Sequence, residues 1–282
     1  MFDYFYMLDW SASSKPKLGK DSIWRAGITL ADGSIEAPVN LATRAQAWSW
    51  FETLVESCER RNQRAVVGFD FAFAYPLGTA AALGARVGDT PWVYTWQTIA
   101  GLIRDADDNA NNRFEVGAEL NARIMANLGT TSGPFWGVLR AQKYPTIGPN
   151  KPKDFTALPE WRTVERLIKG CQPGWKLAYA GSVGGQALVG IAGLQGLRNQ
   201  GLNFAVWPFE ETTSAPVIVA ETYPSHWSLK VNRYPVKDAN QVEQVVRETN
   251  HQLLLDWLDD EQIPEKSLRE EGWVLGVKAS QD

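Results

Sequence analysis

The sequence predicts an α/β protein with a mixed sheet, and three observations support this fold class. Continuous apolar runs of the kind found in buried strands occur at residues 2–9, 65–69 and 215–224. Two further strand patterns, 22–30 and 34–41, are joined by Ala31-Asp32-Gly33, in which Asp-Gly is a typical hairpin turn. Most of the remaining chain has helical periodicity. We therefore expect antiparallel strands at the start of the chain and helices packed on the sheet.

The elements follow in order along the chain. Thr43 fits the N-cap of a helix over 44–61, where apolar residues recur at three- and four-residue spacing. A further strand is expected at 202–209. Other helical patterns lie at 91–104, 113–128, 159–169, 184–199 and 237–258. We expect a sheet of five strands or slightly more in one domain, residues 1–282, with a large helical insertion over about 77–200.

One segment of this insertion lacks any periodic pattern. Residues 143–159 contain four prolines, which is typical of an ordered loop. Within the helical pattern that follows, Arg162 and Glu165 stand three residues apart, and such a spacing usually gives a surface ion pair.

Composition limits the classes of function. The net charge of −4 gives no general attraction for nucleic acid, so a polyanion would need a local basic patch or metal ions. The two cysteines, Cys58 and Cys171, form no CxxC pair, which makes structural zinc improbable. No run of apolar residues is long enough to span a membrane, and the N-terminus does not resemble a secretion signal. We therefore expect a cytoplasmic protein; the oligomeric state is not indicated.

Three predicted core strands end in a carboxylate. These are Asp9, Asp70 and Glu221. Ligand sites of open α/β sheets lie beyond the carboxyl ends of the strands, so the three acids are expected in one crevice. Clustered carboxylates repel one another, and a divalent cation removes that repulsion. Because the ligands are oxygens, Mg²⁺ or Mn²⁺ is the expected cofactor.

Asp238 is a fourth candidate for this acidic site. It begins the last predicted helix, where an acid also complements the helix dipole. Both roles remain open at this point.

Two candidates for substrate binding lie near predicted loops and helix starts. Arg113 stands between Asn112 and Glu115 at the start of a helix and could offer its guanidinium to a phosphate, although Asn there is also a common N-cap. Lys20 precedes the second strand and could reach the crevice, although a solvated lysine is the simpler interpretation.

Ser182 and His226 are the remaining candidates. Ser182 lies in the glycine-rich stretch 180–191, whose backbone amides could form an anion site or could simply allow close helix packing. His226 follows a predicted strand end and could act as an acid or base, although a structural or solvated role is the simpler interpretation.

Short motifs that match a known protein family extend over nearly the whole chain. They are LDWSAS, KDSIW, GFDFAFAYP, NNRFEV, GPFWG, GSVGGQALVGI, VWPFE, ETYPS, VKDANQV and EEGWVLGV. With these motifs the chain resembles a bacterial family whose members are labelled predicted ribonuclease H-like nucleases. The resemblance implies a ribonuclease H-like sheet and places Asp9, Asp70, Glu221 and Asp238 on the acidic positions of that superfamily. It further implies two metal ions that activate water for phosphodiester hydrolysis.

Three functions are consistent with these patterns. The first is a magnesium-dependent, nuclease-like hydrolase acting on a short or single-stranded nucleic acid or on a nucleotide. The second is a nucleotide-dependent phosphotransferase or ATPase of the actin-like branch. The third is a binding module without catalysis that uses the acidic crevice for a cation.

Overall fold

In the part of the chain that the structure describes, six strands form one mixed sheet in the order β3-β2-β1-β4-β6-β5. The structure is a computed structural model that describes residues 1–227, 229–259 and 261–279. The strands are β1 (Tyr4–Asp9), β2 (Ile23–Thr29), β3 (Ile35–Leu41), β4 (Ala65–Phe69), β5 (Phe204–Val206) and β6 (Val217–Glu221). The predicted α/β class and mixed sheet are confirmed.

The strand directions bring three strand ends to one edge of the sheet. Strands β1, β2 and β3 are antiparallel neighbours, whereas β4 is parallel to β1, and β6 is parallel to β4. Leu8 is in register with Phe69, and Phe69 is in register with Glu221. Strands β1, β4 and β6 therefore end side by side, at what we call the carboxyl edge.

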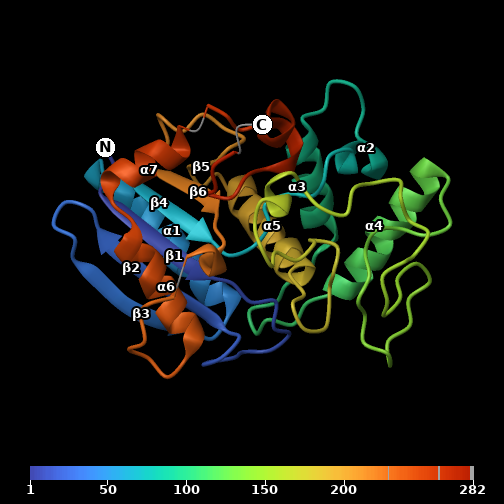
Figure 1. Cartoon of the computed structure of the whole chain (residues 1–282), viewed down its shortest axis with the longest axis horizontal. Helices are drawn as coiled ribbons and strands as arrows, with labels where there is room; N and C mark the ends of the chain where they lie inside the picture. The colour runs from blue at the N-terminus through green and yellow to red at the C-terminus, as the bar shows by residue number, and fades with distance from the viewer. Residues whose placement is uncertain (228, 260, 280–282) are drawn as a thin grey trace.

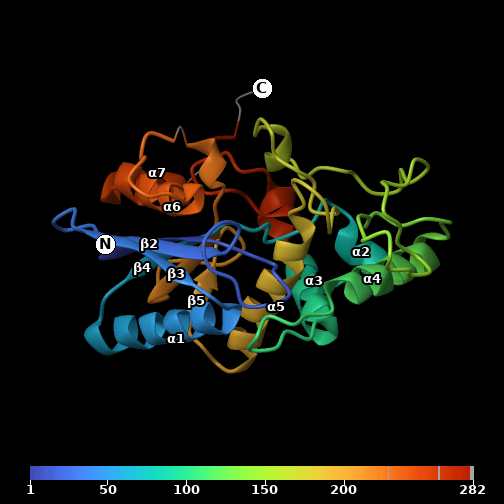
Figure 2. The same ribbon diagram turned by 90° about the horizontal axis from the view of Figure 1, so that it is seen from below.

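Helices cover both faces of the sheet and extend beyond its carboxyl edge. The α-helices are α1 (Arg44–Arg61), α2 (Thr79–Leu83), α3 (Pro91–Leu102), α4 (Arg113–Leu128), α5 (Gly184–Asn199), α6 (Lys237–Glu248) and α7 (His251–Leu258). Shorter helical turns are η1 (Val164–Arg166), η2 (Pro224–His226) and η3 (Ser267–Glu271). Figure 2 shows α6 and α7 on one face and α1 on the other, with α5 on the same side as α1. Helices α2, α3 and α4 lie beyond the carboxyl edge (Figure 1).

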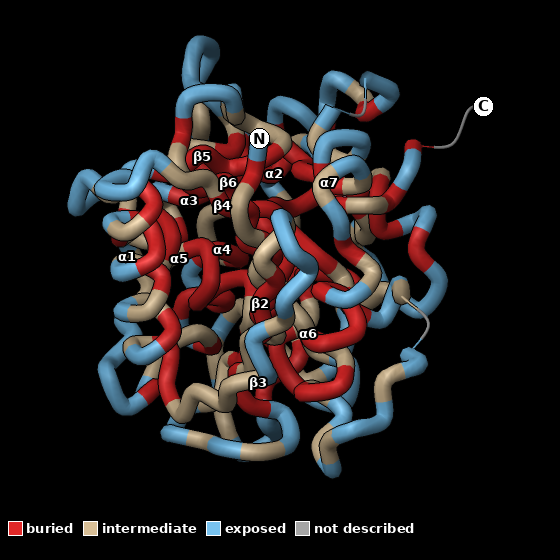
Figure 3. The backbone as a smooth tube through the Cα atoms, turned by 90° about the vertical axis from the view of Figure 1, so that its left-hand side faces the viewer, coloured by how far each residue is buried: buried red, intermediate tan, exposed pale blue. Residues whose placement is uncertain are grey.

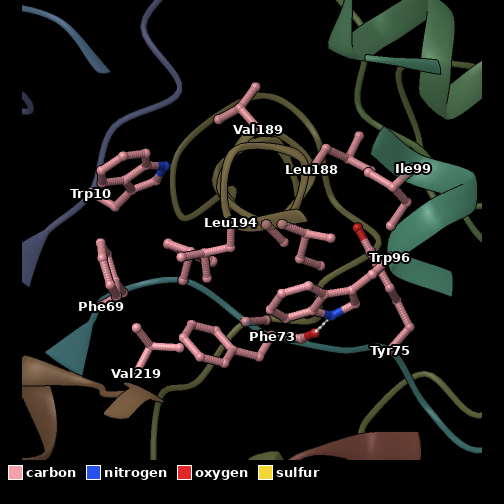
Figure 4. Packing of buried hydrophobic residues seen from close by; sticks show 14 of the residues in the cluster. Trp10, Phe69, Phe73, Tyr75, Trp96, Ile99, Leu188, Val189, Leu194 and Val219 are labelled. Carbon is pink, nitrogen blue, oxygen red and sulfur yellow. Dashed lines mark hydrogen bonds between the residues drawn. The ribbon is translucent and has the colours of Figure 1, made fainter. Parts of the chain in front are cut away.

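Alternating strand residues supply two hydrophobic cores, one on each face. In β4, Val67 and Phe69 pack toward α1 and α5, and Val66 packs toward α6. Figure 3 shows the buried backbone concentrated in the sheet and the elements against it. In the first core, Figure 4 shows α5 side chains such as Leu194 among aromatic rings that include Trp10 and Phe69. Both faces of β4 are therefore closed, which explains its continuous apolar sequence.

The sequence located most elements and missed some boundaries. The helix expected over 44–61 is α1, and Thr43 caps it by accepting the N–H of Gln46. The helix expected over 159–169 is wrong, since only η1 forms there. The expected 237–258 helix is broken into α6 and α7, because Asn250 adopts an extended conformation and caps α7 by accepting the N–H of Leu253.

The predicted absence of a membrane-spanning helix is confirmed for the described part of the chain. Across residues 1–227, 229–259 and 261–279, no helix combines the length and the hydropathy needed to cross a bilayer.

Candidate active site at the carboxyl edge

Asp9 and Asp70 form a close carboxyl pair on neighbouring parallel strands. Asp9 is the last residue of β1, and Asp70 directly follows β4. The backbone N–H of Asp70 donates to the carbonyl of Leu8 at 2.9 Å, which continues the ladder by one residue. The two carboxyl groups share a hydrogen bond, and both residues are half-buried. Strand pairing therefore places two acids in direct contact.

This contact changes the protonation of both acids. Burial raises the pKa of Asp9 well above its ordinary value, and repulsion from Asp70 and Asp238 raises it further. The pKa of Asp70 is raised to about 7 by burial and by repulsion from Glu221, although the hydrogen bond from Asp9 acts in the opposite direction. The pair therefore retains a proton near neutral pH, which two solvated aspartates would not do.

Asp238 and Asp21 flank the pair on the side of α6. Asp238 lies in the first turn of α6, and its Oδ2 accepts the backbone N–H of Asp21 at 2.7 Å. Both of these carboxylates contribute to the raised pKa of Asp9. Asp21 was not predicted as a site residue, because its position in the loop before β2 carries no distinctive sequence signal.

Glu221 ends β6 as expected, but its carboxylate is already fully engaged. Arg162 donates from Nη1 to Oε2 at 2.7 Å and from Nη2 to Oε1 at 2.5 Å. The backbone N–H of Phe73 also donates to Oε2, at 3.0 Å. This leaves Glu221 less available to a metal ion than the Asp9–Asp70 pair.

The expectation of a surface ion pair between Arg162 and Glu165 is wrong, because the pair forms in the interior of the protein. Arg162 Nε donates to Glu165 Oε1 at 2.8 Å, but both side chains are 2% exposed. The three-residue spacing came from a helix that does not form, and the segment instead packs inside the protein. Burial of Arg162 is tolerated because two carboxylates compensate its charge.

The acids that could hold a metal ion at the carboxyl edge are Asp9 and Asp70, which are in direct contact. Among the residues that the structure describes, no group of three or more His, Cys, Asp or Glu side chains is arranged to hold a metal ion. Mg²⁺, however, commonly binds through one or two carboxylates and keeps several of its waters. A divalent ion bound by Asp9 and Asp70 would relieve the repulsion between their carboxylates.

Arg113 and Ser182 line one pocket of about 470 Å³. Its wall includes Ser11 and Ser13, which follow Asp9 closely in the chain, and Asp21 at the side of the carboxyl pair. Gln186 closes the wall and donates from Nε2 to the carbonyl of Trp10 at 2.5 Å. Two of the predicted substrate-binding residues thus share one cavity.

The other predicted substrate-binding residues have separate positions. Asn112 ties the start of α4 to the preceding loop, accepting the N–H of Arg104 and donating to the carbonyl of Leu102. Glu115 forms an exposed salt bridge with Arg104. Lys20 and His226 are exposed, and the structure shows no contact between either side chain and the carboxyl pair within its described residues.

Comparisons with known proteins gave no relatives. No protein-family model, no curated protein and no solved structure matches the chain.

Proposed function

We propose that this protein is a metal-dependent phosphodiester hydrolase of the ribonuclease H-like type, acting on a short or single-stranded nucleic acid or on a nucleotide. The observation that carries this proposal is the hydrogen-bonded Asp9–Asp70 pair, in which both carboxyl groups have raised pKa values. Perturbed acids in contact at the ends of parallel strands are typical of functional sites.

The sheet topology supports the proposal. An antiparallel β1-β2-β3 meander, a helix α1, and then β4 parallel to β1 correspond to the topology that the resemblance implies. The parallel strand β6 extends the sheet on the far side of β4. In the topology that the resemblance implies, the first and fourth strands each contribute an acid to the reaction centre. Asp9 and Asp70 stand at the ends of the corresponding strands, β1 and β4.

Each acid at the carboxyl edge has its own role in this proposal. Asp9 and Asp70 would hold Mg²⁺ or Mn²⁺, which would supply positive charge to a phosphoryl oxygen and lower the pKa of an attacking water. The proton shared by the pair must leave when the ion binds. Asp238 is oriented by the N–H of Asp21 and faces the same centre.

Glu221 acts differently from the other acids in this proposal. Its carboxylate is held by Arg162, and it raises the pKa of Asp70 by repulsion without offering a free oxygen pair. We therefore propose one tightly held ion at Asp9 and Asp70, in place of the two ions expected from the resemblance.

The test is hydrolysis of end-labelled short single-stranded RNA and DNA, and of nucleotides, in a magnesium titration. Activity that requires Mg²⁺ and falls at least about a hundredfold in both Asp9→Asn and Asp70→Asn supports the proposal. Asp107→Asn, at an exposed position, is the matched control and should keep full activity. ATP turnover without strand cleavage, or full activity of Asp70→Asn, would contradict the proposal.

A further inference from the structure

The pocket that Arg113 and Ser182 line contains charged side chains of both signs. Arg113 at the start of α4 and Lys17 are its cations, and Asp21 is its anion. The loop after β1 and the segment before α5 complete the lining with Ser11, Ser13 and Ser182, of which Ser11 and Ser13 already use their hydroxyls in backbone hydrogen bonds. A cavity of about 470 Å³ is large enough for a nucleotide fragment.

Arg113 is half-buried and, unlike the buried Arg44 and Arg162, lacks an ion-pair partner among the described residues. Its Nη1 donates to Ser14 Oγ at 2.7 Å and to Asn111 Oδ1 at 2.9 Å, both of which are neutral. Its Nε is buried without any acceptor. By contrast, Arg44 and Arg162 each hold a carboxylate at 2.5 Å. No salt bridge to Arg113 occurs within the described ranges, so part of its hydrogen-bonding capacity is unused.

The electrostatic surroundings leave this guanidinium under-compensated. Burial and repulsion from the nearby Arg44 together lower the pKa of Arg113 to about 10, and attraction to Asp105 offsets this only in part. A positive charge that is desolvated and close to another cation is stabilised when an anion enters beside it.

The first turn of α5 adds hydrogen-bond donors to the same pocket. Gly185 and Gln186 both line it, and within the described residues their backbone N–H groups meet no protein acceptor. A Cβ on Gly185 would lie 2.9 Å from Arg113 Cδ and 3.3 Å from Ala12 Cβ. The absence of a side chain there is what allows the guanidinium to lie against the helix start.

We propose that this pocket binds a phosphate group of the substrate, held by Arg113, the Ser182 hydroxyl and the first amides of α5. The inference rests on the proposed function and narrows its substrate class. The preferred substrate carries at least two phosphates, one hydrolysed at Asp9 and Asp70 and its neighbour held in the pocket. A planar guanidinium fork and free backbone amides suit phosphate oxygens, and Asp21 in the pocket lining is close enough to Asp9 for its charge to raise the pKa of Asp9.

The first experiment measures binding without catalysis. Inorganic phosphate and a 5′-phosphorylated dinucleotide are titrated into the full-length protein in EDTA, with heat as the readout. Arg113→Met should weaken binding of both ligands at least about tenfold, and Arg113→Lys should recover part of it. Arg123→Met is the matched control, since Arg123 lies on the same helix in an exposed pair with Glu119.

A second variant guards against an effect of misfolding. Gly185→Ala should displace the guanidinium and weaken binding while the circular dichroism spectrum stays unchanged. Unchanged phosphate affinity in Arg113→Met with an intact fold would overturn the proposal, as would the absence of phosphate binding to the wild-type protein. Because these titrations contain no metal, they can succeed or fail independently of the hydrolysis test at Asp9 and Asp70.

The substrate preference gives an additional readout. If the pocket holds a neighbouring phosphate, a 5′-phosphorylated dinucleotide should be cleaved with a lower KM than the same dinucleotide without the terminal phosphate. Arg113→Met should remove this difference in KM. Equal KM values for the two dinucleotides in the wild-type protein would contradict the assignment.

Discussion

Arg162 pairs with both carboxylate oxygens of Glu221, and this buried contact joins the segment before α5 to the end of β6. Arg162 also donates to the backbone carbonyl of Glu271 at 3.1 Å, so a third part of the chain meets at the same guanidinium. The contact also bears on Asp70, whose pKa is raised by the charge of Glu221. The stability of the carboxyl edge thus depends on one arginine from outside the sheet.

We predict that Arg162→Met strongly destabilises the protein. The substitution keeps much of the side-chain length but leaves Glu221 and Glu165 buried without their counter-charge. Removing one partner of a buried ion pair costs roughly 3–5 kcal/mol of unfolding free energy. Equilibrium unfolding in urea at pH 7 measures this loss.

A neighbouring arginine provides the control for this substitution. Arg166 lies four residues further along and is exposed, so Arg166→Met should change the free energy by less than about 0.5 kcal/mol. Equal, small effects of the two substitutions would show that the Arg162–Glu221 contact does not hold the segment.

We predict that the metal-free protein loses stability as the pH rises from about 4 to about 7. The pKa of Asp70 is near 4 in the unfolded chain and about 7 in the folded protein, so the folded state binds more protons in this window. The stabilising contribution is complete below about pH 4 and is lost as the pH passes through 7. Asp9 acts in the same direction because its pKa is also raised.

The difference between the wild type and Asp70→Asn isolates this contribution. Other carboxylates have their own pH dependence, but they are common to both proteins and cancel in the difference. In EDTA, Asp70→Asn should gain stability relative to wild type between pH 5 and 8, by roughly 1–4 kcal/mol. A difference that does not vary with pH would show that Asp70 is ionised normally.

We predict that magnesium affinity decreases in acid. The ion must displace the proton held by the Asp9–Asp70 pair, so the apparent Kd should rise about tenfold for each pH unit below 7. Calorimetric titrations in two buffers of different ionisation enthalpy should show about one proton released per ion at pH 6. An affinity that is constant from pH 5.5 to 7.5 would place the ion elsewhere.

The sequence predicted the positions of the acids better than their partners. Apolar runs that end at Asp9, Asp70 and Glu221 were sufficient to place all three at strand ends, because strand burial leaves a clear local pattern. Whether a carboxylate is free depends on contacts between distant segments. Glu221 and Arg162 are 59 residues apart, and nothing in either local sequence indicates the pairing.

The same reasoning explains the helix boundaries. The break between α6 and α7 is caused by Asn250 acting as an N-cap, which a continuous apolar pattern over 237–258 conceals. The expected helix over 159–169 does not form, because its polar residues, including Arg162, make buried hydrogen bonds and do not face solvent. In both cases a specific polar contact overrode the hydrophobic period.

We predict that Gly68→Ala destabilises the carboxyl edge. A Cβ on Gly68 would lie 2.5 Å from Thr222 Cγ2, in the interior of β4, where the backbone is fixed by pairing on both sides. Such overpacking typically costs about 1–3 kcal/mol. Adding Thr222→Ser removes the obstructing methyl group and should restore part of the loss in urea unfolding.

Gly101→Ala, in α3 with no atom within 4 Å of the new Cβ, should be neutral or slightly stabilising. Equal behaviour of the Gly68 and Gly101 variants would mean that β4 and Thr222 are not packed as closely as described.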